Sequence, residues 1–324
     1  MNDPSRFALY ITNFVQVFII MCALNKAKGM KVNMEVDKIS FITQNEGIFG
    51  SGMVLEKEYS SRFNLLNGDE ISLCSNVGNR KNQEDCIAVS LNDGYLLLLV
   101  SDGMGGMNYG ELASYATART IKDWFDFENR ESLKYLDKQN LEDVLNGLIY
   151  LISTHIPHYS GSTLNMSIIG PNVTFVINVG DSRTYMVKDG KISLVTNDDS
   201  LIFRKYNPKT RDERNKLRFH KKNNIIVNSI SKNAFPNIKI ISINNNDYDI
   251  LCHVTDGITD YLSESLILRY LRGDNSALML VNNAIRGLPI YGDFEEEEYN
   301  ERVNPGNDNA TAVVYTKKRV RIAK

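Results

Sequence analysis

The chain has 324 residues, enough for one large catalytic domain with an N-terminal extension or for two domains. Hydrophobic residues make up 43% and charged residues 23%, as in a soluble globular protein with a sizeable core. The net charge of −2 gives no attraction to nucleic acid, so we expect no nucleic-acid partner. The four cysteines form no CxxC pair, which argues against a zinc site or a disulfide framework and favours a reducing compartment.

The first segment of the chain is apolar and uncharged over residues 7–25, close to the ~20 residues that a helix needs to cross a bilayer. Three lysines follow it: Lys26, Lys28 and Lys31. Positive charge there would keep the rest of the chain in the cytoplasm. Residues 1–31 therefore form an N-terminal extension with three interpretations: a membrane anchor, a core helix, or a translated leader ahead of a start at Met30. In each case we expect residues 32–320 to be cytoplasmic.

Strands and helices follow in groups along the rest of the chain. Residues 86–91 and 95–100, joined by an Asn-Asp-Gly turn, are typical of a β-hairpin that leads into a buried strand. Apolar residues at helical spacing predict helices over 112–125, 141–152 and 278–285. Further strands are predicted at 173–179, 184–187, 191–195, 249–254 and 310–315. Hairpin-linked strands with helices inserted between groups indicate two antiparallel sheets covered by helices, an α+β fold.

Aspartates stand at the ends of several predicted strands. Asp102 follows LLLLVS, Asp181 follows FVINVG, Asp256 follows ILCHVT, and Asp308 precedes ATAVVY. One such residue is ordinarily a turn former or a helix cap. Four of them at converging strand ends would repel one another unless cations were bound. The ligands are oxygens without accompanying cysteine or histidine, which favours Mg²⁺ or Mn²⁺.

A second charged stretch, GNRKNQEDC, precedes the hairpin at residues 78–86. Arg80 and the pair Glu84-Asp85 lie at the head of its first strand. The planar fork of an arginine binds two phosphate oxygens at once, so Arg80 is a candidate phosphate ligand. The alternative interpretation is a surface Arg–Glu pair beside a turn.

Six short stretches stand in a characteristic order over roughly residues 70–316. They are RKNQED at 80–85, DGMGG at 102–106, GST at 161–163, VGDSR at 179–183, TDGITD at 255–260 and DNAT at 308–311. Together they resemble the signatures of the PPM-type, metal-dependent serine/threonine protein phosphatases, also called type 2C. The resemblance implies a four-layer α-β-β-α sandwich, a phosphorylated protein substrate and a site with two Mn²⁺ or Mg²⁺ ions.

The resemblance also implies roles for individual residues. Asp102 would bridge both ions, Asp256 and Asp308 would complete one of them, and Glu84 with the Gly103 carbonyl would serve the other. Asp85 would act from behind these ligands by holding metal-bound waters, and Arg80 would orient the phosphoryl group. A water or hydroxide activated by both ions would be the nucleophile. Two interpretations of Asp181 stay open: a ligand of a weaker third ion, or a structural hydrogen bond with Ser182 or Arg183.

The chain departs from the family pattern at several positions. Met104 stands where many members have histidine, and the family's D-H-S step reads Asp198-Asp199-Ser200. A glycine of the family pattern is missing near residues 229–233. The variable flap of the family corresponds to about 201–230, and residues 203–222 carry nine Lys or Arg against two acids. This basic flap would either steer acidic phosphopeptides or form a solvated face or mobile loop.

Three functions are compatible with these features. The leading one is a monomeric phosphoserine/phosphothreonine phosphatase that opposes a kinase in signalling. The alternatives are a phosphohydrolase of small molecules on the same fold, or a pseudophosphatase that serves as a non-catalytic scaffold. The complete set of carboxylates argues against the pseudophosphatase.

Overall fold

The computed structural model describes residues 35–36, 39–43, 45–49, 52–55, 58–105, 109–127, 133–217, 220, 222–286 and 307–318. All of them belong to one compact unit. The predicted extension at 1–31, with its apolar run at 7–25, lies outside the described residues. Among the helices that are described, none is both long enough and apolar enough to cross a membrane.

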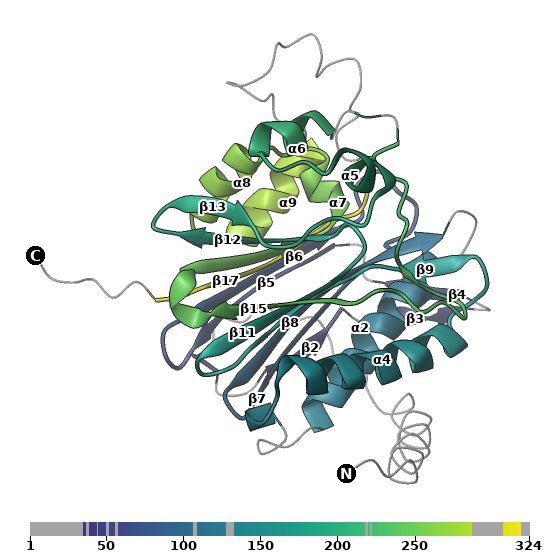
Figure 1. The fold of residues 1–324 in the computed structure, drawn as a ribbon, viewed down its shortest axis with the longest axis horizontal. Coiled ribbons are helices and arrows are strands. Elements are labelled where there is room, and N and C mark those ends of the chain that lie inside the picture. Colours follow the sequence, from purple (N-terminus) through teal and green to yellow (C-terminus); the bar gives the residue numbers. More distant parts are fainter. Residues whose placement is uncertain are drawn as a thin grey trace, which may run out of the picture. The chain divides into compact units, whose positions relative to one another are not determined.

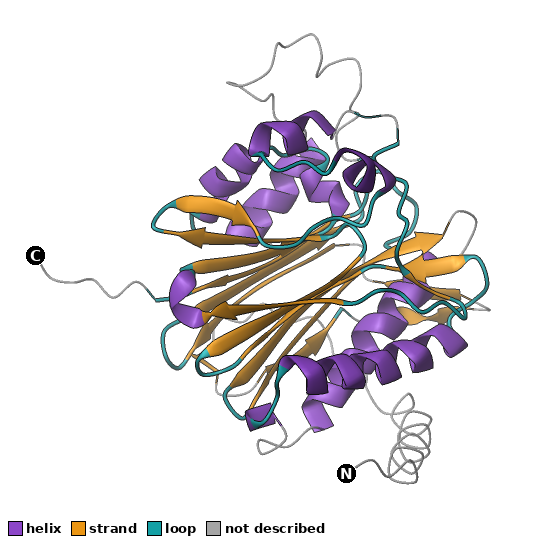
Figure 2. Cartoon of the chain, viewed as in Figure 1, coloured by secondary structure: helices purple, strands orange, loops and turns teal. Residues whose placement is uncertain are grey.

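Two large sheets face each other, and helices cover their outer faces (Figures 1 and 2). The first has seven strands in the order β1 (Glu35–Val36), β5 (Glu58–Leu65), β6 (Glu70–Asn76), β17 (Ala310–Thr316), β16 (Ile250–Val254), β12 (Arg183–Lys188), β13 (Lys191–Leu194). Its neighbouring strands are antiparallel except for β1 and β5, which run parallel.

The second sheet has eight strands. Its main path is β14 (Ile230–Ser231), β9 (Ser160–Ser162), β8 (Tyr95–Gly105), β10 (Leu164–Ile169), β11 (Val173–Val179), β15 (Lys239–Asn244). Strand β7 (Asp85–Asn92) pairs with β8 on one side and with β2 (Ile39–Ile42) on the other. A separate pair is formed by β3 (Asn45–Phe49) and β4 (Gly52–Leu55).

Three apolar clusters fill the spaces between the four layers. Strand β8 shows how one sequence serves two of them, because alternate side chains of a strand point to opposite faces. Leu97 and Leu99 belong to the cluster under the helices α2 (Gly110–Phe127) and α4 (Lys138–His155). Leu96 and Leu98 belong to the cluster between the sheets. The third cluster joins the seven-stranded sheet to α7 (Asp256–Thr259), α8 (Glu264–Leu271) and α9 (Ser276–Arg286).

The predicted α+β sandwich of two helix-covered sheets is therefore confirmed, and β1 is its one departure from antiparallel pairing in the described sheets. The predicted hairpin is also present. Asp93 and Gly94 both have positive φ (49° and 82°), the geometry of the two-residue turn that matches the twist of paired strands. The predicted helix at 141–152 is α4, which begins after Asp137, whose side chain accepts a hydrogen bond from the Asn140 amide.

The basic flap is more ordered than a solvated loop. It contains two short helices, α5 (Leu201–Tyr206) and α6 (Arg211–Leu217), and buries Ile202 and Phe203. Arg214 of α6 forms a two-pronged ion pair with Glu264 of α8, with N–O distances of 2.6 and 2.9 Å. The sequence alone shows only a run of charged residues here. The ion pair could not be predicted from it, because its two residues are 50 positions apart.

Candidate metal centre

The carboxylates that the sequence singled out come from both sheets. Asp85, the first residue of β7, is the register partner of Asp102 in β8. Asp256 is the first residue of α7, two residues after the end of β16, and Asp308 lies two residues before β17. Strands β16 and β17 are neighbours in the first sheet, and both also contact β8 of the second. One end of the sandwich therefore collects these four side chains.

The backbone around Gly103 is packed too closely for any other residue. A Cβ there would lie 2.2 Å from the Gly110 carbonyl oxygen and 2.6 Å from the Glu84 carbonyl oxygen. The Gly103 amide donates a 3.0 Å hydrogen bond to the same Glu84 oxygen. Gly110, at the start of α2, has a similar constraint, because a Cβ would lie 2.8 Å from Glu84 Oε1. These contacts place Glu84 directly beside Gly103.

The carboxylates of the site act on one another's ionisation. Burial raises the pKa of Asp102 well above its usual value, and the charges of Asp256, Asp85, Asp308 and Asp181 raise it further. Burial and neighbouring carboxylates, Asp308 foremost, act on the pKa of Asp256 in the same direction. Burial, and then the charge of Glu111, raise the pKa of Glu84 to about 7. Such a site repels its own ionised form, and bound cations would remove this repulsion.

Among the described residues, three buried carboxylate oxygens in this region have no hydrogen-bond partner: Asp85 Oδ1, Glu111 Oε2 and Asp181 Oδ1. A buried carboxylate oxygen without a partner is costly, so a cation or its water is a fitting occupant. Within the described residues, however, no three His, Cys, Asp or Glu side chains converge closely enough to ligate an ion as they stand. Asp102 and Asp256 are nevertheless close enough that, after burial, the charge of Asp256 raises the pKa of Asp102, as expected of carboxylates that no cation neutralises.

Solvent access differs between the predicted ligands and their supports. Glu84, Asp102, Asp256 and Asp308 are partly exposed, so an ion could reach them. Asp85 is buried, and its Oδ2 accepts a 2.9 Å hydrogen bond from the Thr255 hydroxyl. This placement behind the exposed carboxylates agrees with the supporting role expected for Asp85.

Arg80 lies at the rim of the site. Its Nη2 is 2.9 Å from Asp308 Oδ2, and its Nε donates a 2.8 Å hydrogen bond to the Asn307 carbonyl oxygen. Arg80 therefore forms its ion pair with Asp308, a candidate metal ligand, and Glu84 lies near enough for its charge to favour the protonated guanidinium as well. The Arg80 side chain is 51% exposed, which leaves it accessible to a substrate.

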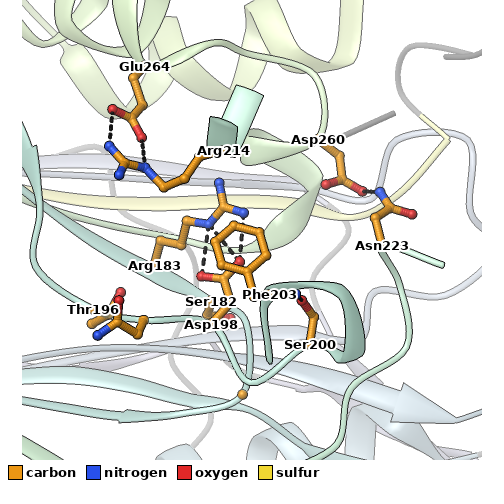
Figure 3. A network of polar contacts seen from close by, with 12 residues as sticks. Ser182, Arg183, Thr196, Asp198, Ser200, Phe203, Arg214, Asn223, Asp260 and Glu264 are labelled. Atoms are coloured by element: carbon orange, nitrogen blue, oxygen red, sulfur yellow. Dashed lines mark hydrogen bonds and ion pairs between the residues drawn. The ribbon is translucent and has the colours of Figure 1, made fainter. Parts of the chain in front are cut away.

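Asp181 lies in a turn just after Gly180, which has φ +100°. The two residues that the alternative interpretation gave it as hydrogen-bond partners are engaged elsewhere. Ser182 pairs with the Thr163 hydroxyl at 2.9 Å, and Arg183 binds Asp198 through Nε and Nη2 (Figure 3). Asp181 instead lines a pocket with Asp256 and Asp260, under the flap. Burial, and then the charge of Asp198, raise the pKa of Asp181.

Three supporting residues were not recognised as such from the sequence. The Asn309 side chain accepts a 2.8 Å hydrogen bond from the Glu84 amide and donates to the Val77 carbonyl. The Thr163 hydroxyl accepts a 2.9 Å hydrogen bond from the Asp102 amide, and Thr255 binds Asp85 as described above. All three belong to the DNAT, GST and TDGITD stretches, so their place in these stretches is the sequence feature that could have pointed to them.

A two-sheet sandwich with a cluster of carboxylates and an arginine at one end defines a metal-dependent phosphatase. A family model described as protein phosphatase 2C matches residues 75–275, and the chain belongs to this family. The match agrees with the resemblance carried by the six sequence stretches.

Relatives of known name and solved structures that are similar to this chain are also protein phosphatases. The serine/threonine phosphatase stp of Listeria monocytogenes is 25% identical over 196 residues, 57% of this chain and 76% of the relative. A putative protein phosphatase of Mycoplasma genitalium is 24% identical over 72% of this chain and 90% of its own length. The structure of the Streptococcus agalactiae (S. agalactiae) serine/threonine phosphatase superposes with a TM-score of 0.59, at 25% identity over 77% of this chain and 100% of that one. A PstP catalytic domain in complex with two manganese ions gives a TM-score of 0.56, at 23% identity over 76% of this chain and 96% of that one.

Proposed function

We propose that this chain is a metal-dependent phosphoprotein phosphatase that hydrolyses phosphoserine and phosphothreonine. The observation that carries the proposal is the collection of Asp102, Asp256 and Asp308 with Glu84 at one end of the sandwich, with Arg80 at its rim. The protein phosphatase 2C family and relatives named serine/threonine phosphatases support the substrate class.

The exposed carboxylates would hold two divalent cations. By the resemblance to the type 2C phosphatases, Asp102 is the proposed bridge, and Asp256 and Asp308 would complete one ion. Glu84 and the Gly103 carbonyl would serve the other, and Asp181 is a proposed ligand of a third, weaker ion. When bound, such cations activate water and offset the charge of a phosphoryl group. Hard oxygen ligands suit both Mn²⁺ and Mg²⁺, and the manganese in the related PstP structure favours Mn²⁺.

Arg80 would bind the phosphoryl group of the substrate. Its guanidinium is held by Asp308 and the Asn307 carbonyl, so its position is fixed before a substrate arrives. A preorganised donor stabilises transferring phosphoryl oxygens without a cost of rearrangement at the moment of reaction. Asp85 and Thr255 would keep the exposed ligands in place from behind.

We further propose that residues 32–320 work as a monomeric phosphatase domain in the cytoplasm. The support for the compartment is that Cys74, Cys86 and Cys252 are buried and unpaired, which suits a reducing environment. Membrane attachment through residues 7–25 stays a separate proposal, and membrane fractionation after deletion of residues 1–29 tests it.

Hydrolysis of p-nitrophenyl phosphate in the presence of Mn²⁺ tests the metal site. We expect activity that a chelator removes and that Asp102→Asn lowers by at least ~10²-fold, because the variant loses the bridging ligand. Asp126→Asn is the matched control: Asp126 also accepts several hydrogen bonds, including one from Lys122, but it lies on α2 beside Ser90, roughly 17 Å along β7 from Asp85. Full activity of Asp102→Asn would remove this residue from the site.

Substrate binding tests Arg80 and the substrate class together. Arg80→Ala should raise KM for a phosphothreonine peptide by ~10-fold or more, while Mn²⁺ binding measured by calorimetry stays close to wild type. Unchanged kinetics would show that Arg80 does not contact the phosphate. A panel of phosphoserine, phosphothreonine and phosphotyrosine peptides, with small phosphate esters as comparison, then separates a protein phosphatase from a small-molecule phosphohydrolase.

A further inference from the structure

Asp199 is a buried carboxylate outside the proposed metal ligands, and several segments donate to it. Its side chain is 2% exposed. Oδ1 is 2.5 Å from Lys239 Nζ, at the start of β15. Oδ2 accepts hydrogen bonds from the Gly180 amide (3.2 Å) and from Asn228 Nδ2 (2.7 Å). A charge this deeply buried requires both its counter-ion and its hydrogen bonds.

The backbone of Asp199 binds Gly180 a second time and also binds Val227, the neighbour of Asn228 in the chain. Its amide donates a 2.9 Å hydrogen bond to the Gly180 carbonyl oxygen, and its carbonyl oxygen accepts one of 2.8 Å from the Val227 amide. Gly180 is therefore bound to Asp199 through both its N–H and its C=O. Asp181, the proposed third-ion ligand, is the next residue along the chain.

The other side of the Gly180 turn is closed by Thr163. A Cβ at Gly180 would lie 2.7 Å from Thr163 Cγ2, so the turn has no room to shift that way. The Thr163 hydroxyl is the group that accepts the Asp102 amide hydrogen bond. A continuous path of direct contacts thus leads from Asp199 through Gly180 and Thr163 to the proposed bridging ligand.

Asp199 is also connected to both ends of the flap, through the chain at one end and through hydrogen bonds at the other. Ser200, the next residue, caps α5 by accepting a 3.4 Å hydrogen bond from the Phe203 amide. At the far end of the flap, Val227 and Asn228 are the residues bonded to Asp199. Arg204 of α5 approaches Asp199 to 3.7 Å, but its side chain is 54% exposed, whereas that of Lys239 is 28% exposed. Lys239 is therefore the principal counter-ion.

We propose that Asp199, neutralised by Lys239, is a positioning residue that fixes the Asp181 turn and both ends of the flap against the metal centre. In the sequence, Asp199 occupies the place of histidine in the D-H-S step, where an imidazole could not supply a negative charge for Lys239. The inference rests on the proposed function for its consequence in catalysis, but not for the contacts themselves.

The experiment uses the full chain and three variants. Asp199→Asn removes the charge at constant size, Lys239→Met removes the counter-ion at similar length, and Lys239→Arg retains a cation. We expect Asp199→Asn and Lys239→Met each to lower kcat for p-nitrophenyl phosphate by ~10-fold, since small displacements of positioned groups cost at least this much. The Mn²⁺ concentration for half-maximal activity should rise, and KM should change little. The double variant should be no worse than either single one, and Lys239→Arg should recover most of the activity.

Hydrogen exchange provides a readout that does not depend on activity. The amides of Gly180 and Val227 should exchange faster in Asp199→Asn than in wild type. The Gly180 amide donates to the substituted side chain, and the Val227 amide donates to the Asp199 backbone carbonyl, whose position that side chain fixes. Asp126→Asn, the control for loss of a remote ion pair, should leave these two amides and kcat unchanged. If wild type itself hydrolyses no phosphate ester, the proposed function fails while the exchange result still decides on the positioning role.

Two outcomes would overturn the proposal. One is exchange at Gly180 and Val227 that matches wild type in Asp199→Asn. The other is a loss of activity that simply follows the fraction of unfolded protein, with additive effects of the two single variants. Where Asp199→Asn fails to fold, the pair of Lys239 variants decides, because Lys239→Met would then have to differ from Lys239→Arg in both readouts.

Discussion

The side chains of this site are held in position by residues that are distant in sequence. Asp102 and Asp256 could be picked out because each follows an apolar run of strand residues, which is a local pattern. The partners that hold them could not, since Thr163 reaches Asp102 across 61 positions. A carboxylate at a strand end can be read from sequence, whereas the hydroxyl that orients it depends on how the strands pair.

Burial strongly changes the acid–base behaviour of His253. It lies in β16 and is fully buried, with hydrogen bonds to Ser167 (2.9 Å) and Asn165 (2.7 Å). Burial lowers the pKa of His253 from 6.5 to about 3. This placement makes His253 a structural residue of the core.

The stability of the fold should depend on pH through His253. Below about pH 6.5 the unfolded chain binds a proton at this residue that the folded chain does not, so stability is full above that pH and is lost as the pH falls toward 3. The contribution is about 1.4 kcal/mol per pH unit within this window. Urea unfolding of wild type and His253→Gln, between pH 7 and about 4.5, should show the smaller slope in the variant. Parallel profiles would contradict the assigned shift.

Helices and strands could be predicted from the sequence where turn residues and apolar spacing within the segment itself specify them. The hairpin β7–β8 and the helix α4 were predicted within a few residues because turn residues and apolar spacing specify them. The pairing of β17 with β6 and the parallel pair β1–β5 were not predicted, since neither follows from any local pattern. The flap helices α5 and α6 were missed for the same reason: contacts with other elements hold them in place.

The turn of the β7–β8 hairpin depends on backbone conformation rather than on packing. Gly94 has φ +82°, and a Cβ there would meet nothing within 4 Å. Gly94→Ala should therefore cost roughly 1 kcal/mol of unfolding free energy from the backbone alone. Gly94→Asn should cost less, because asparagine tolerates the left-handed region. Urea titration measures both variants, and an alanine variant as stable as wild type would contradict the turn geometry.

For the whole molecule, the metal centre and the fold depend on each other. The carboxylates of the site come from strands of two different sheets, so they approach one another only in the folded chain. In the absence of cations their mutual repulsion opposes folding, as the raised pKa values of Asp102 and Asp256 indicate. A cation that binds here binds the native state and not the unfolded one.

Mn²⁺ should therefore raise the thermal stability of the protein independently of any substrate. At 100 times the dissociation constant the gain would be about 2.7 kcal/mol for one ion. Protons compete for the ligands, and Glu84 has a pKa raised to about 7, chiefly by burial, so the gain should be larger at pH 8 than at pH 6. Calorimetric scans with Mn²⁺ and with chelator measure it at each pH. Asp102→Asn should lose most of the gain and Asp126→Asn should keep it, whereas equal stabilisation of both variants would place the ions elsewhere.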